Sequence, residues 1–109
     1  MVRWFRAYWA EEDTWFYFEA DAGGQVTRQV ELCGPLQRPI AAASLAEERA
    51  AQAAGRLVEY ERVFGMTALT PVQQWEGYEP QELSADAFES VWAVAHATCR
   101  MRARIRPQS

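Results

Sequence analysis

The chain has 109 residues, of which half are hydrophobic and 13% are aromatic, and its formal net charge is -4. This length and composition predict one folded domain and exclude a disordered chain. The acidic balance argues against nucleic acid and anionic membranes as partners. No apolar run reaches the about 18 residues of a membrane span, and the N-terminus lacks the apolar core of a signal peptide, so we expect a cytoplasmic protein.

The N-terminal part of the chain carries the pattern of β-strands. Residues 2–9 alternate in side-chain type, and an acidic turn follows at residues 11–13. Residues 14–33 predict a hairpin, because aromatic and β-branched residues fill its arms and Gly23 and Gly24 suit a two-residue turn with positive φ. Pro39 favours a short edge strand at residues 37–42 over a central one.

The register of this hairpin decides which side chains share a face of the sheet. With a two-residue turn, one face carries Trp15, Tyr17, Glu19, Val26, Arg28, Val30 and Leu32. The opposite face carries Phe16, Phe18, Ala20, Thr27, Gln29, Glu31 and Cys33. A one-residue slip or a bulged loop would exchange these assignments.

Two helices are predicted in the rest of the chain. Ser44 and Glu47 form a capping box, and a helical period then runs from Leu45 to Phe64, ending at Gly65. We expect one helix there, with a kink at Gly55 as the alternative. Residues 66–82 have no period and predict an ordered loop, with a short strand near residues 72–75 as an option.

The second helix is expected to begin after Ser84, which is a good N-cap residue. Its apolar stripe consists of Phe88, Val91, Trp92, Ala95 and Cys99. Because an unpaired buried arginine is costly, this helix should leave the core near residues 99–101. An arginine-rich flexible tail is then expected from about residue 102, and the solvated arginines assigned to it are Arg100, Arg102, Arg104 and Arg106.

Strands precede helices along the chain, and this order favours an α+β fold. We expect an antiparallel sheet of three to four strands, mostly N-terminal, with two helices packed on one face. The hairpin places apolar side chains on both faces, so Phe16 and Phe18 would lie on the face that the helices leave open, with Phe5 or Trp9 as an option beside them. Because a large exposed apolar patch usually marks an interface, a homodimer or a protein partner is expected there.

Four hairpin residues are the first candidates for a binding site. Glu19 and Arg28 are either a structural cross-strand ion pair or the polar floor of a pocket with Trp15 and Tyr17 as its walls. In the loop, Trp75 and Tyr78 are either interface anchors or a lid on the core.

His96 is the only histidine, and we expect a packed or hydrogen-bonded role for it, with ligand binding or acid–base chemistry as the alternative. Cys33 and Cys99 lack metal-ligand spacing, so neither a metal nor a cofactor is expected. Both cysteines should be free thiols, with a disulfide as the alternative because sequence does not give their separation.

Several segments resemble those of short proteins of unknown function from high-GC Gram-positive bacteria. These segments are W-F-Y-F-E (15–19), R-Q-V-E-L (28–32), S-L-A-E (44–47), E-Y-E-R-V-F-G (59–65) and F-E-S-V-W (88–92). The resemblance implies a bacterial cytosolic domain and transfers no catalytic residue.

Two function classes follow from these patterns. The first is a non-enzymatic protein-interaction module, of an immunity or regulatory type, because the chain is acidic, rich in aromatic residues and without a recognisable catalytic motif. The second is a small-molecule binder or accessory enzyme with an aromatic pocket around Trp15, Tyr17, Glu19 and Arg28. A deep enclosed pocket would favour the second class, and a flat aromatic patch the first.

Overall fold

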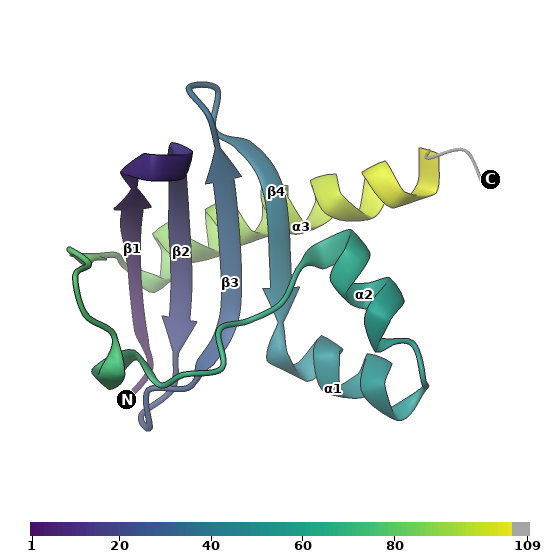
Figure 1. The fold of residues 1–109 in the computed structure, drawn as a ribbon, viewed down its shortest axis with the longest axis horizontal. Helices are drawn as coiled ribbons and strands as arrows, with labels where there is room; N and C mark the ends of the chain where they lie inside the picture. The colour runs from purple at the N-terminus through teal and green to yellow at the C-terminus, as the bar shows by residue number, and fades with distance from the viewer. Residues whose placement is uncertain (106–109) are drawn as a thin grey trace.

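A five-stranded antiparallel sheet forms the centre of the computed structural model, which describes residues 1–105 (Figure 1). The strands are β1 (Arg3–Trp9), β2 (Thr14–Ala20), β3 (Val26–Cys33), β4 (Arg38–Ser44) and β5 (Gln81–Glu82), in the order β4-β3-β2-β1-β5. The helices are α1 (Leu45–Ala53), α2 (Leu57–Phe64) and α3 (Ala85–Ile105), with short 3-10 turns η1 (Ala10–Glu12) and η2 (Val72–Gln74). The α+β prediction is therefore confirmed. The sheet has five strands and not three to four, and there are three α-helices within residues 1–105 and not two.

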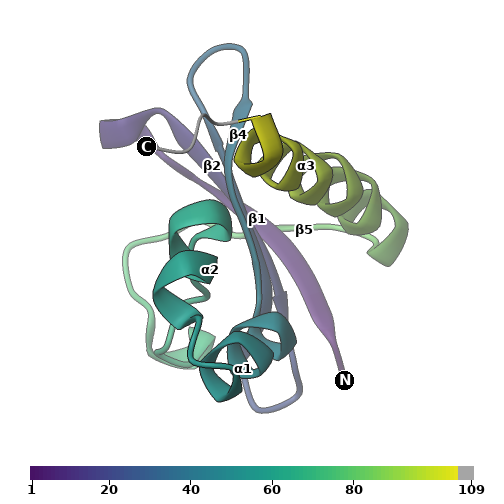
Figure 2. The same cartoon turned by 90° about the vertical axis from the view of Figure 1, so that its right-hand side faces the viewer.

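The helices do not share one face of the sheet, as Figure 2 shows edge-on. α3 crosses one face, α1 and α2 lie beside the β4 edge, and residues 66–80 run across the opposite face (Figures 1 and 2). None of the helices in residues 1–105 is long and apolar enough to cross a membrane.

Each face of the sheet has its own hydrophobic core. The core under α3 contains Tyr17, Val30, Leu32, Ala42, Phe88, Ala95 and Cys99. The core of the opposite face contains Phe5, Phe18, Ala20, Val26 and Val72, with Trp75 and Tyr78 packed over it. Phe18 is only 6% exposed, so the expectation that Phe16 and Phe18 face an uncovered surface is wrong for Phe18. Residues 66–80 cover it within the same chain.

The register of the central hairpin is as expected except near its turn. Tyr17 pairs with Val30 and Glu19 with Arg28, but a bulge between Glu19 and Ala20 pairs Ala20 with Val26. Val26 therefore lies in the core opposite α3 and not beside Arg28, which corrects the prediction. The expected two-residue turn is a five-residue loop, residues 21–25, in which the Asp21 carboxylate accepts two backbone N–H groups at 3.0 Å each.

The predicted long helix is two helices, because Gly55 has a φ of 73°. This left-handed conformation ends α1, and α2 starts again at Leu57. The apolar residues keep their helical spacing through residues 53–57, but the backbone changes direction there. The break lets α2 fold back beside α1 and bring its aromatic side chains to α3.

Most of the predicted helix and strand ends are confirmed. The Ser44 hydroxyl accepts the Glu47 N–H at 3.3 Å, and Ser84 caps α3 through the Ala87 N–H at 3.1 Å. Pro39 lies in the edge strand β4. The short strand expected near residues 72–75 is instead the 3-10 turn η2, and the loop's strand is β5.

The C-terminal helix is longer than predicted. α3 continues through Ile105, so Arg100, Arg102 and Arg104 are helical and exposed, and no tail starts at about residue 102. Arg102 Nη2 donates to the Pro39 carbonyl of β4, and Arg104 is exposed, so neither arginine is buried without a partner and the helix does not need to stop there. Arg106, also assigned to the tail, lies outside the described residues.

Both cysteines are free thiols, as expected. Cys99 is 2% exposed in the core under α3, whereas Cys33 at the end of β3 is partly exposed. Burial raises the pKa of the Cys99 thiol.

Candidate functional site

The pocket predicted around Trp15, Tyr17, Glu19 and Arg28 is filled by α3. Tyr17 is 6% exposed and belongs to the core under this helix. The Arg28 guanidinium lies 5.0 Å from the Phe88 ring centroid and 5.2 Å from that of Trp92. Tyr17 and Arg28 are therefore packed against α3, as in the structural alternative of the prediction. Trp15 packs instead against β1, with the Arg6 guanidinium 4.2 Å from its ring centroid.

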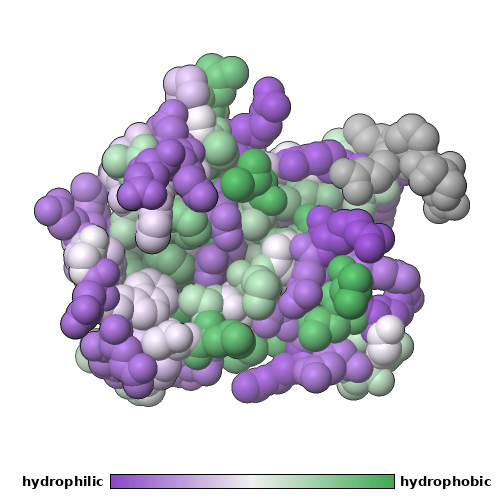
Figure 3. All heavy atoms as spheres, in the orientation of Figure 1, coloured by the Kyte–Doolittle hydropathy of each residue, from purple (hydrophilic) through white to green (hydrophobic). Residues whose placement is uncertain are grey.

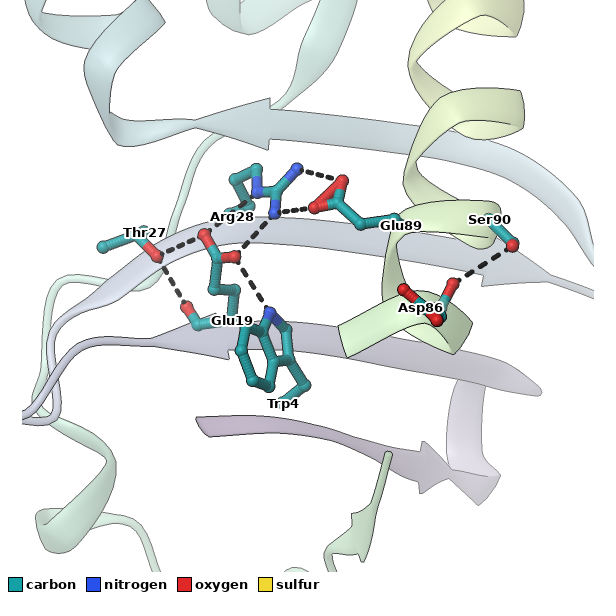
Figure 4. A network of polar contacts seen from close by, with 7 residues as sticks. All are labelled: Trp4, Glu19, Thr27, Arg28, Asp86, Glu89 and Ser90. Atoms are coloured by element: carbon teal, nitrogen blue, oxygen red, sulfur yellow. Dashed lines mark hydrogen bonds and ion pairs between the residues drawn. The ribbon is translucent and has the colours of Figure 1, made fainter. Parts of the chain in front are cut away.

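Glu19 is the acceptor at the centre of a polar network (Figure 4). Its carboxylate accepts hydrogen bonds from Arg28 Nε and Nη2 at 2.9 and 2.6 Å, from Trp4 Nε1 at 2.9 Å and from Thr27 Oγ1 at 2.8 Å. Donation by Arg28, followed by that of Trp4 and Thr27, lowers the pKa of Glu19 from 4.5 to about 2 despite its burial. Glu19 is therefore charged at neutral pH.

The network ties α3 to the sheet. The second side of the Arg28 guanidinium donates to both carboxylate oxygens of Glu89 on α3, at 2.8 and 2.6 Å. The two carboxylates raise the pKa of Arg28. In Figure 4 the Glu89 side chain reaches from the helix to the strand that carries Arg28, so this cluster connects β1, β2, β3 and α3. All its charges are paired, which fits a structural role.

His96 lies in a second polar cluster, at the junction of α1, α2 and α3. Its ring stacks between Phe64 and Trp92, with both centroids 4.8 Å away, and it is 8% exposed. His96 Nε2 is 3.0 Å from Glu47 Oε1, and Arg100 Nη2 is 3.3 Å from His96 Nδ1. Because arginine only donates, Nδ1 accepts, and the proton of the neutral ring lies on Nε2 facing Glu47.

Tyr60 completes this second cluster. Its hydroxyl donates to Glu47 Oε1 at 2.7 Å and accepts the Ser44 N–H at 2.9 Å. Tyr60 therefore occupies the backbone donor that Glu47 was expected to accept in the capping box. Burial is the main cause that raises the pKa of Tyr60. The expected packed and hydrogen-bonded role fits His96, which lies far from the aromatic groove described next.

A groove of about 770 Å³ opens on the sheet face opposite α3. We call it the aromatic groove. The described residues that line it are Ala7, Tyr8, Trp9, Ala10, Glu11, Phe16, Phe18, Gln29, Ala68, Trp75, Glu76, Gly77, Tyr78, Glu79 and Gln81. Figure 3 looks onto this face and shows apolar atoms recessed between polar ones over β1 and β2.

Five aromatic rings follow one another along this groove. Trp9 and Phe16 have centroids 6.4 Å apart, and Phe16 stacks on Phe18 at 6.0 Å. Phe18 meets the edge of Trp75 at 4.8 Å, and Trp75 meets Tyr78 at 5.5 Å. The sheet supplies the first three rings and residues 75–78 the last two. Trp9 is the outermost of the three sheet rings, with 54% of its surface exposed.

The charged side chains that line the aromatic groove within residues 1–105 all have the same sign. Glu11 lies on η1 beside Trp9, and Glu76 and Glu79 flank Tyr78 on the opposite wall. Among the described residues, the lining contains neither arginine nor lysine. Cations are attracted to the faces of aromatic rings as well as to carboxylates. The groove thus combines two groups that favour a positively charged ligand.

The wall formed by residues 75–79 is fixed at both ends, first at the loop between β2 and β3 and then at β1. Before it, the Val72 N–H donates to Gly24 O at 2.9 Å, and Trp75 Nε1 donates to Thr70 O at 2.9 Å. After it, β5 pairs with β1, and Arg3 binds Glu82 at 2.7 Å. A preformed wall lowers the conformational cost of binding.

Farther back along the chain, the same crossing segment is fixed by buried polar contacts. Glu48 of α1 accepts the N–H and hydroxyl of Thr67 at 2.5 and 2.9 Å. Gln29 of β3 accepts the Ala68 N–H at 2.8 Å. Side chains of α1 and β3 therefore anchor the loop that has no sequence period.

The predicted residues regroup in the structure. Trp75 and Tyr78, predicted to bind, meet Phe16 and Phe18, predicted as an interface, in the aromatic groove. Trp15, Tyr17, Glu19, Arg28 and His96 lie elsewhere. The option that Trp9 lies beside Phe16 and Phe18 is confirmed. The sequence reasoning missed Glu11 and Glu79 as part of the site, and it named Glu76 only as a member of the Trp75 and Tyr78 loop. The signal was present, since Glu11 lies in the acidic turn after Trp9 and Glu79 directly follows Tyr78.

No group of three histidine, cysteine, aspartate or glutamate side chains within residues 1–105 is arranged to hold a metal ion. Comparisons with protein-family models, curated proteins and solved structures found no match for this chain.

Proposed function

We propose that this protein is a non-enzymatic binding module whose aromatic groove receives a positively charged side chain of a partner protein. The observation that carries the proposal is the composition of the groove, in which aromatic rings line the floor and every charged side chain among the described residues is acidic.

Arginine and lysine side chains fit this groove chemically. A guanidinium stacks on aromatic faces, and either cation gains from the nearby carboxylates of Glu11, Glu76 and Glu79. Such a contact is worth about 0.5–2 kcal/mol for each well-placed ring. We therefore expect a short basic peptide to bind weakly by itself, with a Kd of about 0.1–1 mM, and a folded partner to add further contacts.

A peptide titration tests the proposal. The probe is a Gly-Ser peptide with one central arginine, compared with the same peptide carrying lysine, alanine or glutamate, and the readout is the NMR signals of the Trp9 and Trp75 indole N–H groups. The basic peptides should shift these signals with saturation, and the alanine and glutamate peptides should not. Equal shifts with the alanine peptide, or none with any basic peptide, would contradict the proposal.

Variants assign the binding to the aromatic groove. Trp9→Ala removes an exposed ring, and the combined change of Glu11, Glu76 and Glu79 to glutamine removes the acidic rim; each should weaken arginine-peptide binding at least about fivefold. Glu61→Gln on α2, away from the groove lining, is the matched control and should bind as the wild type does. Free arginine amide tests whether the ligand is a protein side chain or a small organic cation. Binding equal to that of the peptide would indicate a small organic cation.

A further inference from the structure

The outward side of α3 carries an apolar patch that the described residues leave uncovered. Val94 and Met101 are 65% and 63% exposed, and Ala93 and Ala97 beside them are exposed as well. A shallow depression of about 550 Å³ lies along these residues. Figure 2 shows α3 on its own side of the sheet, with no element of residues 1–105 outside it.

The charges at the two ends of this patch are opposite. Asp86 lies in the first turn of α3 and Arg104 in the last, and both are exposed. They are 18 positions apart (104 minus 86), which is five helical turns, so they lie on the same side of the helix about 27 Å apart. Neither side chain has an ion-pair partner within the described residues.

This pattern is complementary to itself when a second helix runs in the opposite direction. A two-fold axis at the middle of α3, near Ala95, brings Asp86 of one copy to Arg104 of the other at both ends. The same axis brings Ala93 of one copy opposite Ala97 of the other. Small residues allow close approach of two helices, with axes about 8 Å apart, while Val94 and Met101 fill the space beside them.

We propose that the protein forms a symmetric homodimer through antiparallel pairing of α3 with α3 of a second copy. A two-fold interface uses the same patch on both subunits, and this patch carries both charges that the pairing needs. A parallel arrangement would place Asp86 against Asp86 and Arg104 against Arg104, which the charges oppose. The aromatic groove lies on the other face of the sheet, so this proposal stands or fails separately from the proposed function.

The experiment is sedimentation equilibrium of the full chain across the micromolar range, with a charge-exchange design. The variants are Asp86→Arg, Arg104→Asp, and an equimolar mixture of the two. Each variant alone faces two like-charge contacts and should dimerise roughly tenfold more weakly than the wild type. In the mixture, one chain carries arginine at both positions and the other carries aspartate at both. Heterodimers of the two therefore regain an opposite-charge contact at each end and should restore the wild-type affinity.

Two further variants complete the design. Arg62→Asp makes the same change in the last turn of α2, away from the patch, and should leave dimerisation unchanged. Val94→Glu places a charge in the centre of the patch without touching the core and should yield monomers with a native circular dichroism spectrum. If a charge-reversed chain fails to fold, this variant decides whether the patch is the dimer interface. A monomeric wild type, a dimer insensitive to Val94→Glu, or a folded mixture that does not restore affinity would each overturn the proposal.

Discussion

Replacing Glu19 with glutamine should show how strongly the polar network holds α3 to the sheet. The carboxylate accepts four hydrogen bonds, two of them from Arg28. The substitution keeps the size of the side chain but removes the charge and turns an amide NH₂ toward these donors. The only charged partner that Arg28 would retain is Glu89, whose side chain is 52% exposed.

The magnitude follows from the pKa of Glu19, which is lowered from 4.5 to about 2. Each pKa unit corresponds to about 1.4 kcal/mol of free energy. Because the Glu19 side chain is 15% exposed, solvent screening reduces the free energy that the lowered pKa represents. We expect Glu19→Gln to lower the free energy of unfolding by about 2–3 kcal/mol at pH 7. Glu89→Gln, which removes the exposed partner, should cost about 1 kcal/mol or less.

The loss should depend on pH in a defined direction. Because the folded-state pKa of Glu19 is depressed, its contribution is complete above the unfolded-state pKa of 4.5 and disappears as pH falls toward 2. The difference between wild type and Glu19→Gln should therefore be largest at pH 6–7 and shrink steadily below about pH 4.5.

Urea denaturation followed by circular dichroism at pH 7, 4 and 2.5 measures this difference. Comparison with Glu89→Gln at each pH separates the contribution of the Arg28–Glu19 pair from that of the more exposed Arg28–Glu89 pair. A Glu19→Gln variant within about 0.5 kcal/mol of wild type at pH 7 would refute the reasoning. So would a loss that stays constant down to pH 2.5, because the carboxylate would then have no special pKa.

Three further predictions concern the fold. Gly55→Ala should destabilise the protein by about 1 kcal/mol, because φ at this position is 73°; a higher thermal midpoint would show a continuous helix instead. Tyr60→Phe should cost about 1–2 kcal/mol in urea unfolding, since it leaves the Ser44 N–H without its acceptor, and an unchanged midpoint would mean that water replaces the hydroxyl at no cost. Phe18→Ala should cost about 3–5 kcal/mol, as for a core phenylalanine under Val72 and Trp75, and a cost below about 1 kcal/mol would show that residues 66–80 do not cover it.

The sequence predicted what local physics determines. Alternation located the strands, Pro39 marked an edge strand, and Ser44 and Ser84 gave the helix starts, because each of these signals acts over a few residues. The bulge before Val26 was not predictable, since a sequence period of two does not reveal an extra residue in one strand. Gly55 fitted a helix equally well by period, and its positive φ depends on how α2 packs.

The candidate site was harder to predict because it combines segments that are distant in the chain. Trp75 and Tyr78 were found as aromatic residues in a loop, and Phe16 and Phe18 as apolar residues on one face of a hairpin. Their meeting depends on residues 66–80 crossing the sheet, which Gln29 and Glu48 enforce through side-chain contacts to the backbone. Contacts of this kind follow no period, so sequence alone assigned the two pairs to different surfaces.

The contrast between the two cysteines gives this protein a built-in probe of its own motions. A thiol reagent reaches the partly exposed Cys33 in the native state, whereas Cys99 is 2% exposed, and burial raises the pKa of its thiol. Modification of Cys99 requires α3 to lift from β4. The rate at which the second thiol reacts therefore reports how often this helix opens, without an added label and without unfolding of the whole chain.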